Sequence, residues 1–371
     1  MSTYIKMCGL GSVLPGDPVS FDEINDYLGE FPHASQKIQK WTKRVQPIIK
    51  EMLGISHCHY AFDKETRTFF DDNLTLSVKA ATKALDMAGM KAKDIELIIY
   101  GGAHSEQIPP ISTRIQESLG IHRCAEFQIH SNCTSVYKAI KLADVMLRSG
   151  EYKNALVISS SIASSCFMPE FYNQEILTKD DIFLRWYLCD GAGAIVFNSQ
   201  KEKDKGFFLE DTYIESSGGN KQAAMYNELP YRWNSPLENY TTGAHHIRQI
   251  YLSDMKEFAL EDNGKTIFYN ALGRMLEDKK IDLSKLKNFV VNMPSRFVRS
   301  FIIDECLNYG IQKEKFYSAI EDIGYAGPPA AIISVDRLID NQVFENEDLI
   351  FSFAMEVSKF MQAGFTLRYY E

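Results

Sequence analysis

Residues 128–159 read QIHSNCTSVYKAIKLADVMLRSGEYKNALVIS, and this stretch carries the strongest fold signal in the chain. An apolar, strand-like run ends just before Cys133, and a helical spacing of apolar residues follows from Val136 to Leu147. Ser149-Gly150 then ends the helix, and Ala155–Ser159 is a continuous apolar run typical of a buried strand. The order strand, helix, strand predicts an α/β unit with Cys133 at the turn that opens its helix.

Cys133 occupies a position that favours reactivity. The N-terminus of a helix carries a partial positive charge and several backbone N–H groups without intrahelical partners. Both favour the thiolate, the nucleophilic form of cysteine, and the same N–H groups can bind a developing oxyanion. The pattern therefore predicts a nucleophile that accepts an acyl group, with a buried structural thiol as the alternative.

Composition limits the classes of protein that need to be considered. The chain has 371 residues, 45% hydrophobic and 24% charged, which is enough for two domains or one large two-lobed one. Its net charge of −9 argues against a general nucleic-acid binder. The seven cysteines form no metal-ligand spacing, and no apolar run has the length of a membrane span. We therefore expect a cytoplasmic protein with no metal, nucleic-acid partner or membrane span.

The chain repeats one order of elements in its two halves. A helical pattern leads to a continuous apolar strand twice in each half, and each half closes with an alternating strand. The four helix–strand units are residues 75–102, 136–159, 264–293 and 330–352, and the closing strands are 192–197 and 365–370. Parallel strands covered on both faces follow from this pattern. We predict an internally duplicated, layered α/β/α/β/α fold whose halves are residues 1–203 and 204–371.

Two stretches lie outside the repeat. Residues 35–52 have the spacing of a basic amphipathic helix, whose charges form either a solvated face or a contact surface. Residues 218–247 are rich in Asn, Tyr and Gly, and we expect a long loop or cap there.

Four segments together resemble a known family. They are Cys8–Pro15 (CGLGSVLP), the helix region Pro110–Gly120, His130–Ser135 (HSNCTS) with the helix and strand after it, and Leu188–Ala194 (LCDGAGA). Their order and spacing over essentially the whole chain are similar to the thiolase superfamily, and within it to the ketoacyl-acyl-carrier-protein (ACP) synthase III-like enzymes. The resemblance implies the thiolase-like five-layered fold and Cys133 as the acyl-accepting nucleophile.

The chain departs from the family at the partners of the cysteine. The family has a Cys-His-Asn triad, but Met293 stands where the resemblance places the histidine, and Tyr325 stands where it places the asparagine. The family's glycine-rich loop before the last strand is here residues 355–364, with one glycine. The family's histidine and asparagine donate hydrogen bonds to the thioester carbonyl, and such donors are each worth roughly 3 kcal/mol. Methionine offers no donor, which disfavours decarboxylative condensation by the usual route and leaves acyl transfer.

Several residues are candidates for the remaining catalytic roles. His104 follows the predicted strand 96–101, near where the related HMG-CoA synthases place a catalytic glutamate, and it is either a base or a loop histidine facing water. His130 is either a substrate-binding residue or a hydrogen-bonded core histidine. Glu106 and Glu356 are weaker candidates. We expect Asp190 to brace its turn and His245-His246 to lie at the surface.

The resemblance also implies partners. Acyl-carrier proteins are acidic, so an acidic enzyme needs a local basic patch to dock one. Arg296 and Arg299 stand where related synthases place basic docking residues, next to Met293 in the substrate site, and Lys40, Lys43 and Arg44 are further candidates. The donor would be an acyl-carrier protein or a CoA thioester, with no other cofactor. Family members are homodimers, and residues 125–129 are a fair match for the pairing strand.

Three functions remain open from the sequence. The first is an acyltransferase of the ketoacyl-ACP synthase III type, in fatty-acid-like or polyketide and other specialised metabolism, that uses Cys133 with His104 or Tyr325. The second is a catalytically reduced partner subunit of an active ketosynthase, in a heterodimer. The third is a condensing enzyme with a rebuilt active site.

Overall fold

The computed structural model describes residues 3–103, 107–228, 235–250 and 259–371. Ten strands share one hydrogen-bonded sheet in the order β12-β11-β13-β14-β8-β1-β7-β6-β4-β5. This sheet consists of two five-stranded halves, which join through three residue pairs between β1 and β8. Each half corresponds to one half of the sequence.

The strands of the two halves have matching order and direction. The first half contains β1 (Tyr4–Val13), β4 (Leu97–Gly102), β5 (Ala125–His130), β6 (Asn154–Ile162) and β7 (Asp190–Gln200). The second contains β8 (Gly206–Ser216), β11 (Leu286–Val291), β12 (Phe316–Tyr317), β13 (Leu349–Glu356) and β14 (Met361–Tyr370). In each half three neighbouring strands pair in parallel. The two strands nearest the junction pair antiparallel with each other, and the second of them from the junction also pairs antiparallel with the parallel group.

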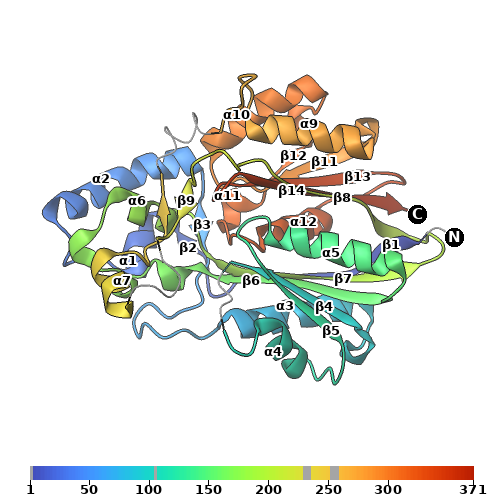
Figure 1. Ribbon diagram of the computed structural model, residues 1–371, viewed down its shortest axis with the longest axis horizontal. Helices are drawn as coiled ribbons and strands as arrows, with labels where there is room; N and C mark the ends of the chain where they lie inside the picture. The colour runs from blue at the N-terminus through green and yellow to red at the C-terminus, as the bar shows by residue number, and fades with distance from the viewer. Residues whose placement is uncertain (1–2, 104–106, 229–234, 251–258) are drawn as a thin grey trace.

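Six helices complete the layers. They are α3 (Asn73–Ala88), α4 (Ile111–Ser118), α5 (Ser135–Ser149), α9 (Ile267–Lys279), α10 (Arg296–Cys306) and α12 (Ala330–Asn341). Figure 1 shows α5 and α12 between the two halves of the sheet, α3 and α4 below them, and α9 and α10 above. Separate apolar clusters fill the central layer and the two outer layers. The predicted five-layered, duplicated α/β/α/β/α architecture is confirmed.

A side lobe extends beyond the layers, on the left of Figure 1. Its elements are α1 (Ile24–Leu28), α2 (Gln36–Leu53), α6 (Lys179–Ile182), α7 (Pro236–Thr242), β2 (Val19–Ser20), β3 (His57–Cys58), β9 (Met225–Tyr226) and β10 (Arg248–Gln249). A fourth apolar cluster lies in this lobe. The helix predicted over 35–52 is therefore confirmed as α2. The stretch 218–247 is not only loop, because it holds β9 and α7.

Short helical turns connect these elements. They are α11 (Ile320–Ile323), η1 (Phe21–Glu23), η2 (Ala92–Asp94), η3 (Ala163–Cys166), η4 (Pro169–Phe171), η5 (Gln174–Ile176), η6 (Phe183–Trp186), η7 (Leu283–Lys285), η8 (Leu307–Tyr309) and η9 (Lys313–Lys315). Four of them, η3, η4, η5 and η6, belong to the segment that leads from β6 through the side lobe to β7. This segment brings lobe residues to the end of the central layer, where the site lies.

Close approach of β1 to α3 depends on glycine. A Cβ at Gly9 would lie 1.9 Å from the backbone oxygen of Ala84, and one at Gly11 would lie 2.7 Å from that of Ala80. No heavy atom can occupy those positions unless the helix moves away from the sheet. The glycines of the segment 8–15 therefore set the spacing between the outer helix layer and the first half of the sheet.

We predict that Gly9→Ala lowers the free energy of unfolding by about 2–3 kcal/mol, because the added methyl group overpacks a backbone contact. Denaturant-induced unfolding measures this difference. Gly219→Ala is the matched control, since no atom lies within 4 Å of its Cβ, and it should change the value by less than about 0.5 kcal/mol. Equal unfolding midpoints for the two variants would contradict the packing argument.

Candidate active site

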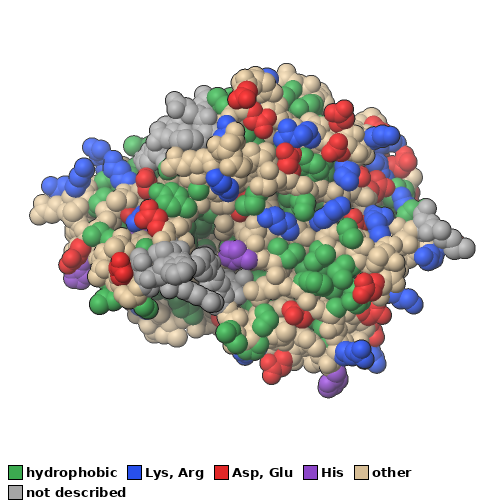
Figure 2. All heavy atoms as spheres, viewed as in Figure 1, with side chains coloured by type: hydrophobic (Ala, Val, Ile, Leu, Met, Phe, Trp, Pro, Cys, Tyr) green, Lys and Arg blue, Asp and Glu red, His purple; other side chains and the backbone are tan. Residues whose placement is uncertain are grey.

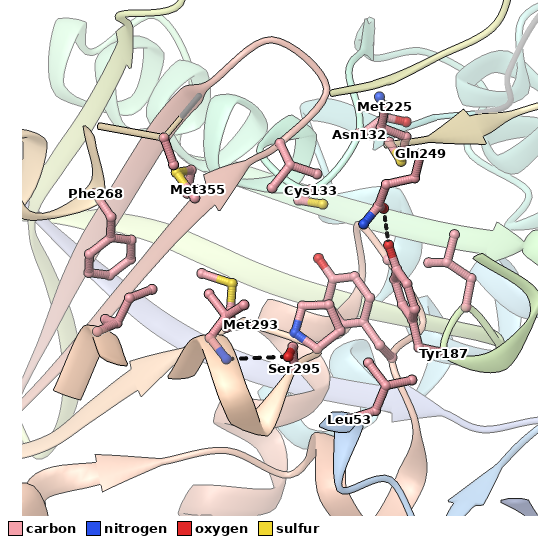
Figure 3. Close-up of a pocket in the computed structure, with 18 of the residues that line it drawn as sticks. Leu53, Asn132, Cys133, Tyr187, Met225, Gln249, Phe268, Met293, Ser295 and Met355 are labelled. Atoms are coloured by element: carbon pink, nitrogen blue, oxygen red, sulfur yellow. Dashed lines mark hydrogen bonds between the residues drawn. The ribbon is translucent and has the colours of Figure 1, made fainter. Parts of the chain in front are cut away.

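Cys133 lies in the turn between β5 and α5 and lines a cavity of about 390 Å³. Figure 3 shows its sulfur pointing into the open space of the cavity. Most of the lining is apolar, and it includes Leu53, Met225, Phe268, Met293, Met355 and Phe360. These side chains come from the side lobe and from the second half of the sheet, while the cysteine comes from the first half. The cavity therefore forms where all three parts of the molecule meet.

The carboxylate of Glu356 caps the turn that carries Cys133. It accepts hydrogen bonds from the Ser131 hydroxyl at 2.9 Å, the Thr134 backbone N–H at 3.0 Å, the Thr134 hydroxyl at 2.6 Å and the Ser358 hydroxyl at 2.6 Å. Burial acts to raise the pKa of Glu356, but these hydrogen bonds outweigh it and hold the pKa below its usual range. Glu356 is therefore an ionised carboxylate fixed at the N-terminus of α5.

This contact corrects one expectation for the helix N-terminus. We expected several free backbone N–H groups there, but Glu356 accepts the Thr134 N–H, and the Ser135 N–H donates to the carbonyl of Asn132 at 2.9 Å. The reason is that β13, in the second half of the chain, ends directly at this turn. An oxyanion at Cys133 thus cannot use these two N–H groups.

The thiol of Cys133 is held in its neutral form. Burial raises the pKa of Cys133 to about 12, the nearby Glu356 carboxylate acts in the same direction, and a hydrogen bond with Tyr325 acts against both. This direction is opposite to the one that a helix N-terminus alone would give. The thiolate is therefore the minor form near neutral pH, so the reactivity of Cys133 depends on the groups that contact it.

Tyr325 contacts the sulfur directly. Its hydroxyl hydrogen-bonds the Cys133 thiol, and burial together with the cysteine raises the pKa of Tyr325 well above its usual value. Two backbone hydrogen bonds fix its main chain, from Tyr325 N–H to the Tyr187 carbonyl at 3.2 Å and from Cys189 N–H to the Tyr325 carbonyl at 3.0 Å. The tyrosine that stands in place of the asparagine is therefore beside the nucleophile.

Met293 also lies in the cavity, just beyond the end of β11. Figure 3 shows its side chain directed into the same open space as the Cys133 sulfur. It is buried, with 4% of its surface exposed, and its thioether has no hydrogen to donate. The position that the resemblance gives to a histidine is thus apolar here.

A pair of polar side chains completes the wall near Cys133. The Tyr187 hydroxyl donates a hydrogen bond to Oε1 of Gln249, and both side chains are buried. No sequence pattern pointed to either residue, because Tyr187 follows the short turn η6 and Gln249 lies in the two-residue strand β10. Both belong to segments outside the repeated pattern.

The sequence predicted two histidines for the site, His130 and His104. His130 is exposed at the end of β5, so it is not a core histidine; it is absent from the cavity lining, and its role in substrate binding stays a prediction. The physical reason for its exposure is that β5 is the edge strand, so its last residue faces outward. His104 and the weaker candidate Glu106 lie outside the described residues, although the neighbouring Ala103 lines the cavity.

The two arginines of α10 form ion pairs near the cavity. Arg296 lies 3.3 Å from Glu321 with 56% of its side chain exposed, while Arg299 pairs with the same carboxylate and has 12% exposed. Other side chains of α10, including Phe297, line the cavity. Arg296 is therefore accessible, whereas the guanidinium of Arg299 is largely covered and pairs with Glu321; the docking role of both arginines stays a prediction.

The structure agrees with the expectation for Asp190 and differs from the expectation for His246. Asp190 accepts hydrogen bonds from the Ala61 and Ser164 backbone N–H groups at 2.8 and 2.9 Å, so it braces its turn as expected. Burial raises the pKa of Asp190 to about 6 in spite of these bonds. His246 is buried rather than at the surface, because its ring hydrogen-bonds the buried Asp181 at 3.2 Å.

Two kinds of site are absent from the part of the chain that the structure describes. No group of three or more His, Cys, Asp or Glu side chains there has the arrangement needed to hold a metal ion. No helix there combines the length and the apolar character needed to cross a bilayer.

Comparison with known proteins agrees with this geometry. Residues 127–218, which include Cys133, match the family model for 3-oxoacyl-ACP synthase III. A beta-ketoacyl-ACP synthase III of Clostridium perfringens is 26% identical over 320 residues, covering 86% of this chain and 85% of that protein. The chain is thus similar to ketoacyl-ACP synthase III enzymes over most of its length, and the segment that carries Cys133 matches the model of that family.

Solved structures support the same fold. A tetronic acid condensing enzyme superimposes with a TM-score of 0.78 at 17% identity, covering 98% of this chain and 99% of that one. A 3-oxoacyl-ACP synthase III from Aquifex aeolicus gives a TM-score of 0.72 at 19% identity, covering 98% and 100%. At these identities the similarity establishes the thiolase-like architecture, while the chemistry must be argued from the site.

We predict that Glu356→Gln accelerates alkylation of Cys133 by iodoacetamide at pH 8. Removing the negative charge lowers the pKa of the thiol, and below that pKa each unit of decrease raises the thiolate fraction about tenfold. Peptide mass spectrometry of Cys133 gives the rate. Glu345→Gln, on the surface, serves as the control and should leave the rate unchanged. A slower reaction in Glu356→Gln would refute the electrostatic role of this carboxylate.

Tyr325→Phe should have the opposite effect on the same reaction. Loss of the hydroxyl removes a hydrogen bond that favours the thiolate, so the pKa of Cys133 rises and alkylation slows by about tenfold or more. The exposed Tyr240 of α7 provides the control variant Tyr240→Phe, for which we expect the wild-type rate. An unchanged rate in Tyr325→Phe would show that the hydroxyl does not act on the sulfur.

Proposed function

We propose that this protein is an acyltransferase in which Cys133 takes an acyl group from a thioester and passes it to an acceptor. The observation that carries this proposal is the opening of the Cys133 sulfur into a largely apolar cavity of about 390 Å³. An apolar cavity next to a thiol fits a fatty-acid-like or polyketide-like acyl chain, because burial of its methylene groups supplies the binding free energy. The acceptor is an amine, an alcohol or a carbon nucleophile.

The proposed step is a thioester exchange. The Cys133 sulfur attacks the acyl carbon, a new S–C bond forms, and the S–C bond to the donor thiol breaks. The proton of Cys133 leaves with the departing donor thiol, so the exchange needs no oxidant, reductant or bound cofactor. The Tyr325 hydroxyl stabilises the sulfur while it carries negative charge. His104 stays our candidate for the base that activates the acceptor.

The donor would be an acyl-carrier protein or CoA, met in the cytoplasm. Lys37, Lys40, Lys43 and Arg44 are exposed on α2, and Figure 2 shows blue side chains gathered over this helix. Leu53 at the end of α2 lines the cavity, and Arg296 hydrogen-bonds the carbonyl of Gly54 at 3.5 Å. This positive surface, on the helix whose C-terminal end lines the cavity, suits an acidic carrier or the phosphates of CoA. We further propose pairing with a second ketosynthase chain through the edge strand β5, where Phe127 is 39% exposed.

A specific observation favours a second function, that of a catalytically reduced partner subunit. Glu356 accepts the hydrogen bond of the Thr134 N–H, and its charge acts to raise the pKa of Cys133. Met293 offers no donor. These three features oppose acylation. In a heterodimer such a chain would stabilise an active ketosynthase. Carbon–carbon condensation in a rebuilt site is the third alternative, and release of carbon dioxide from a malonyl thioester would identify it.

We predict that incubation with acyl-CoA or acyl-carrier thioesters adds the mass of one acyl group to the protein, and that Cys133→Ala abolishes the increase. Intact-protein mass spectrometry, followed by peptide mapping, locates the added group. Cys124→Ala, at a half-buried thiol that does not line the cavity, should be acylated like the wild type. Absence of any mass increase with every donor tested would favour the partner subunit over the enzyme.

A further inference from the structure

The side chain of Gln249, which pairs with Tyr187 on the cavity wall, has a fixed orientation. Its backbone pairs with Met225 across the β9–β10 ribbon, and only 2% of its surface is exposed. The Tyr187 hydroxyl donates to Oε1, which fixes the plane of the amide and assigns the other end of the side chain to nitrogen. The amide is thus pre-oriented before any ligand enters.

The nitrogen of this amide faces the cavity. Figure 3 shows it directed away from Tyr187 and toward the space into which the Cys133 sulfur points. Within residues 3–103, 107–228, 235–250 and 259–371, this nitrogen has no hydrogen-bond partner. Because it faces the cavity, this nitrogen is available to a hydrogen-bond acceptor that arrives with a ligand.

Three other groups near Cys133 are already bound or cannot donate. The Thr134 N–H is bound to Glu356, the Tyr325 hydroxyl is bound to the sulfur, and Met293 has no hydrogen to give. A thioester carbonyl that approaches the sulfur therefore meets Gln249 as an available donor on the cavity wall.

We infer that Gln249 is a catalytic residue whose side-chain N–H groups bind the carbonyl oxygen of the acyl thioester, with Tyr187 as its positioning residue. This inference rests on the proposed acyl transfer and assigns the donor that the departures from the family pattern leave open. As sulfur attacks, the carbonyl electron pair moves onto oxygen, and the amide stabilises that charge. The carbonyl then re-forms as the donor's C–S bond breaks, and the amide is unchanged.

The test compares two electrophiles on wild-type protein and Gln249→Met. A p-nitrophenyl ester of a medium-chain fatty acid acylates the thiol through an oxyanion and releases p-nitrophenolate, whereas iodoacetamide alkylates the same sulfur by displacement without one. We expect Gln249→Met to slow acylation of Cys133 about 100-fold and to change alkylation less than about threefold. Tyr187→Phe, which keeps the amide but frees its orientation, should give a smaller loss of acylation with the same unchanged alkylation.

Gln312→Met is the matched control, since Gln312 is exposed and far from the cavity lining, and it should acylate like the wild type. Equal losses in acylation and alkylation for Gln249→Met and Tyr187→Phe would overturn the inference, because they would indicate a structural role. No loss in acylation would overturn it as well. Gln249-dependent acylation by the ester without acylation by any thioester would support the inference while refuting the proposed function. If neither the ester nor any thioester acylates wild-type Cys133, both the inference and the proposed function are refuted.

Discussion

The hydrogen bonds between Glu356 and the turn before α5 are the contact on which the site depends. Glu356 ends β13 in the second half of the chain, and the turn belongs to the first half, with Glu356 and Thr134 separated by 222 residues. Because the carboxylate is ionised and buried at a helix N-terminus, it holds the two halves together where the cavity opens. The same charge disfavours the thiolate of Cys133, so structural anchoring and nucleophile reactivity are coupled through one side chain.

The cavity around Cys133 is therefore a different environment from a simple helix N-terminus. Burial and Glu356 keep the thiol neutral, while the Tyr325 hydroxyl favours its ionised form. Apolar residues such as Met293 and Met355 exclude water and strengthen each of these electrostatic effects, since the local dielectric constant is low. The reactivity of this sulfur therefore depends on the balance between Glu356 and Tyr325.

Much of the fold could be predicted from local signals. The periods of 3.6 and 2 residues mark the helices and strands, and Gly89 and Gly150 end α3 and α5 in the left-handed conformation expected of such stops. The position of Cys133 between β5 and α5 followed from the same signals. His246 and the 218–247 stretch were less accessible to prediction, because hydrogen bonds to the distant Asp181 decide the burial of that histidine.

The sequence by itself determined the duplicated order of helices and strands and put a cysteine at the start of a helix, because these features depend on residues close together in the chain. Tertiary structure alone decided which groups surround that cysteine. Tyr325, Glu356 and Gln249 come from separate segments of the second half, and their contacts with the site arise only when the layers and the side lobe pack. Electrostatic effects on a buried sulfur depend on distance in space, and no local pattern encodes that distance.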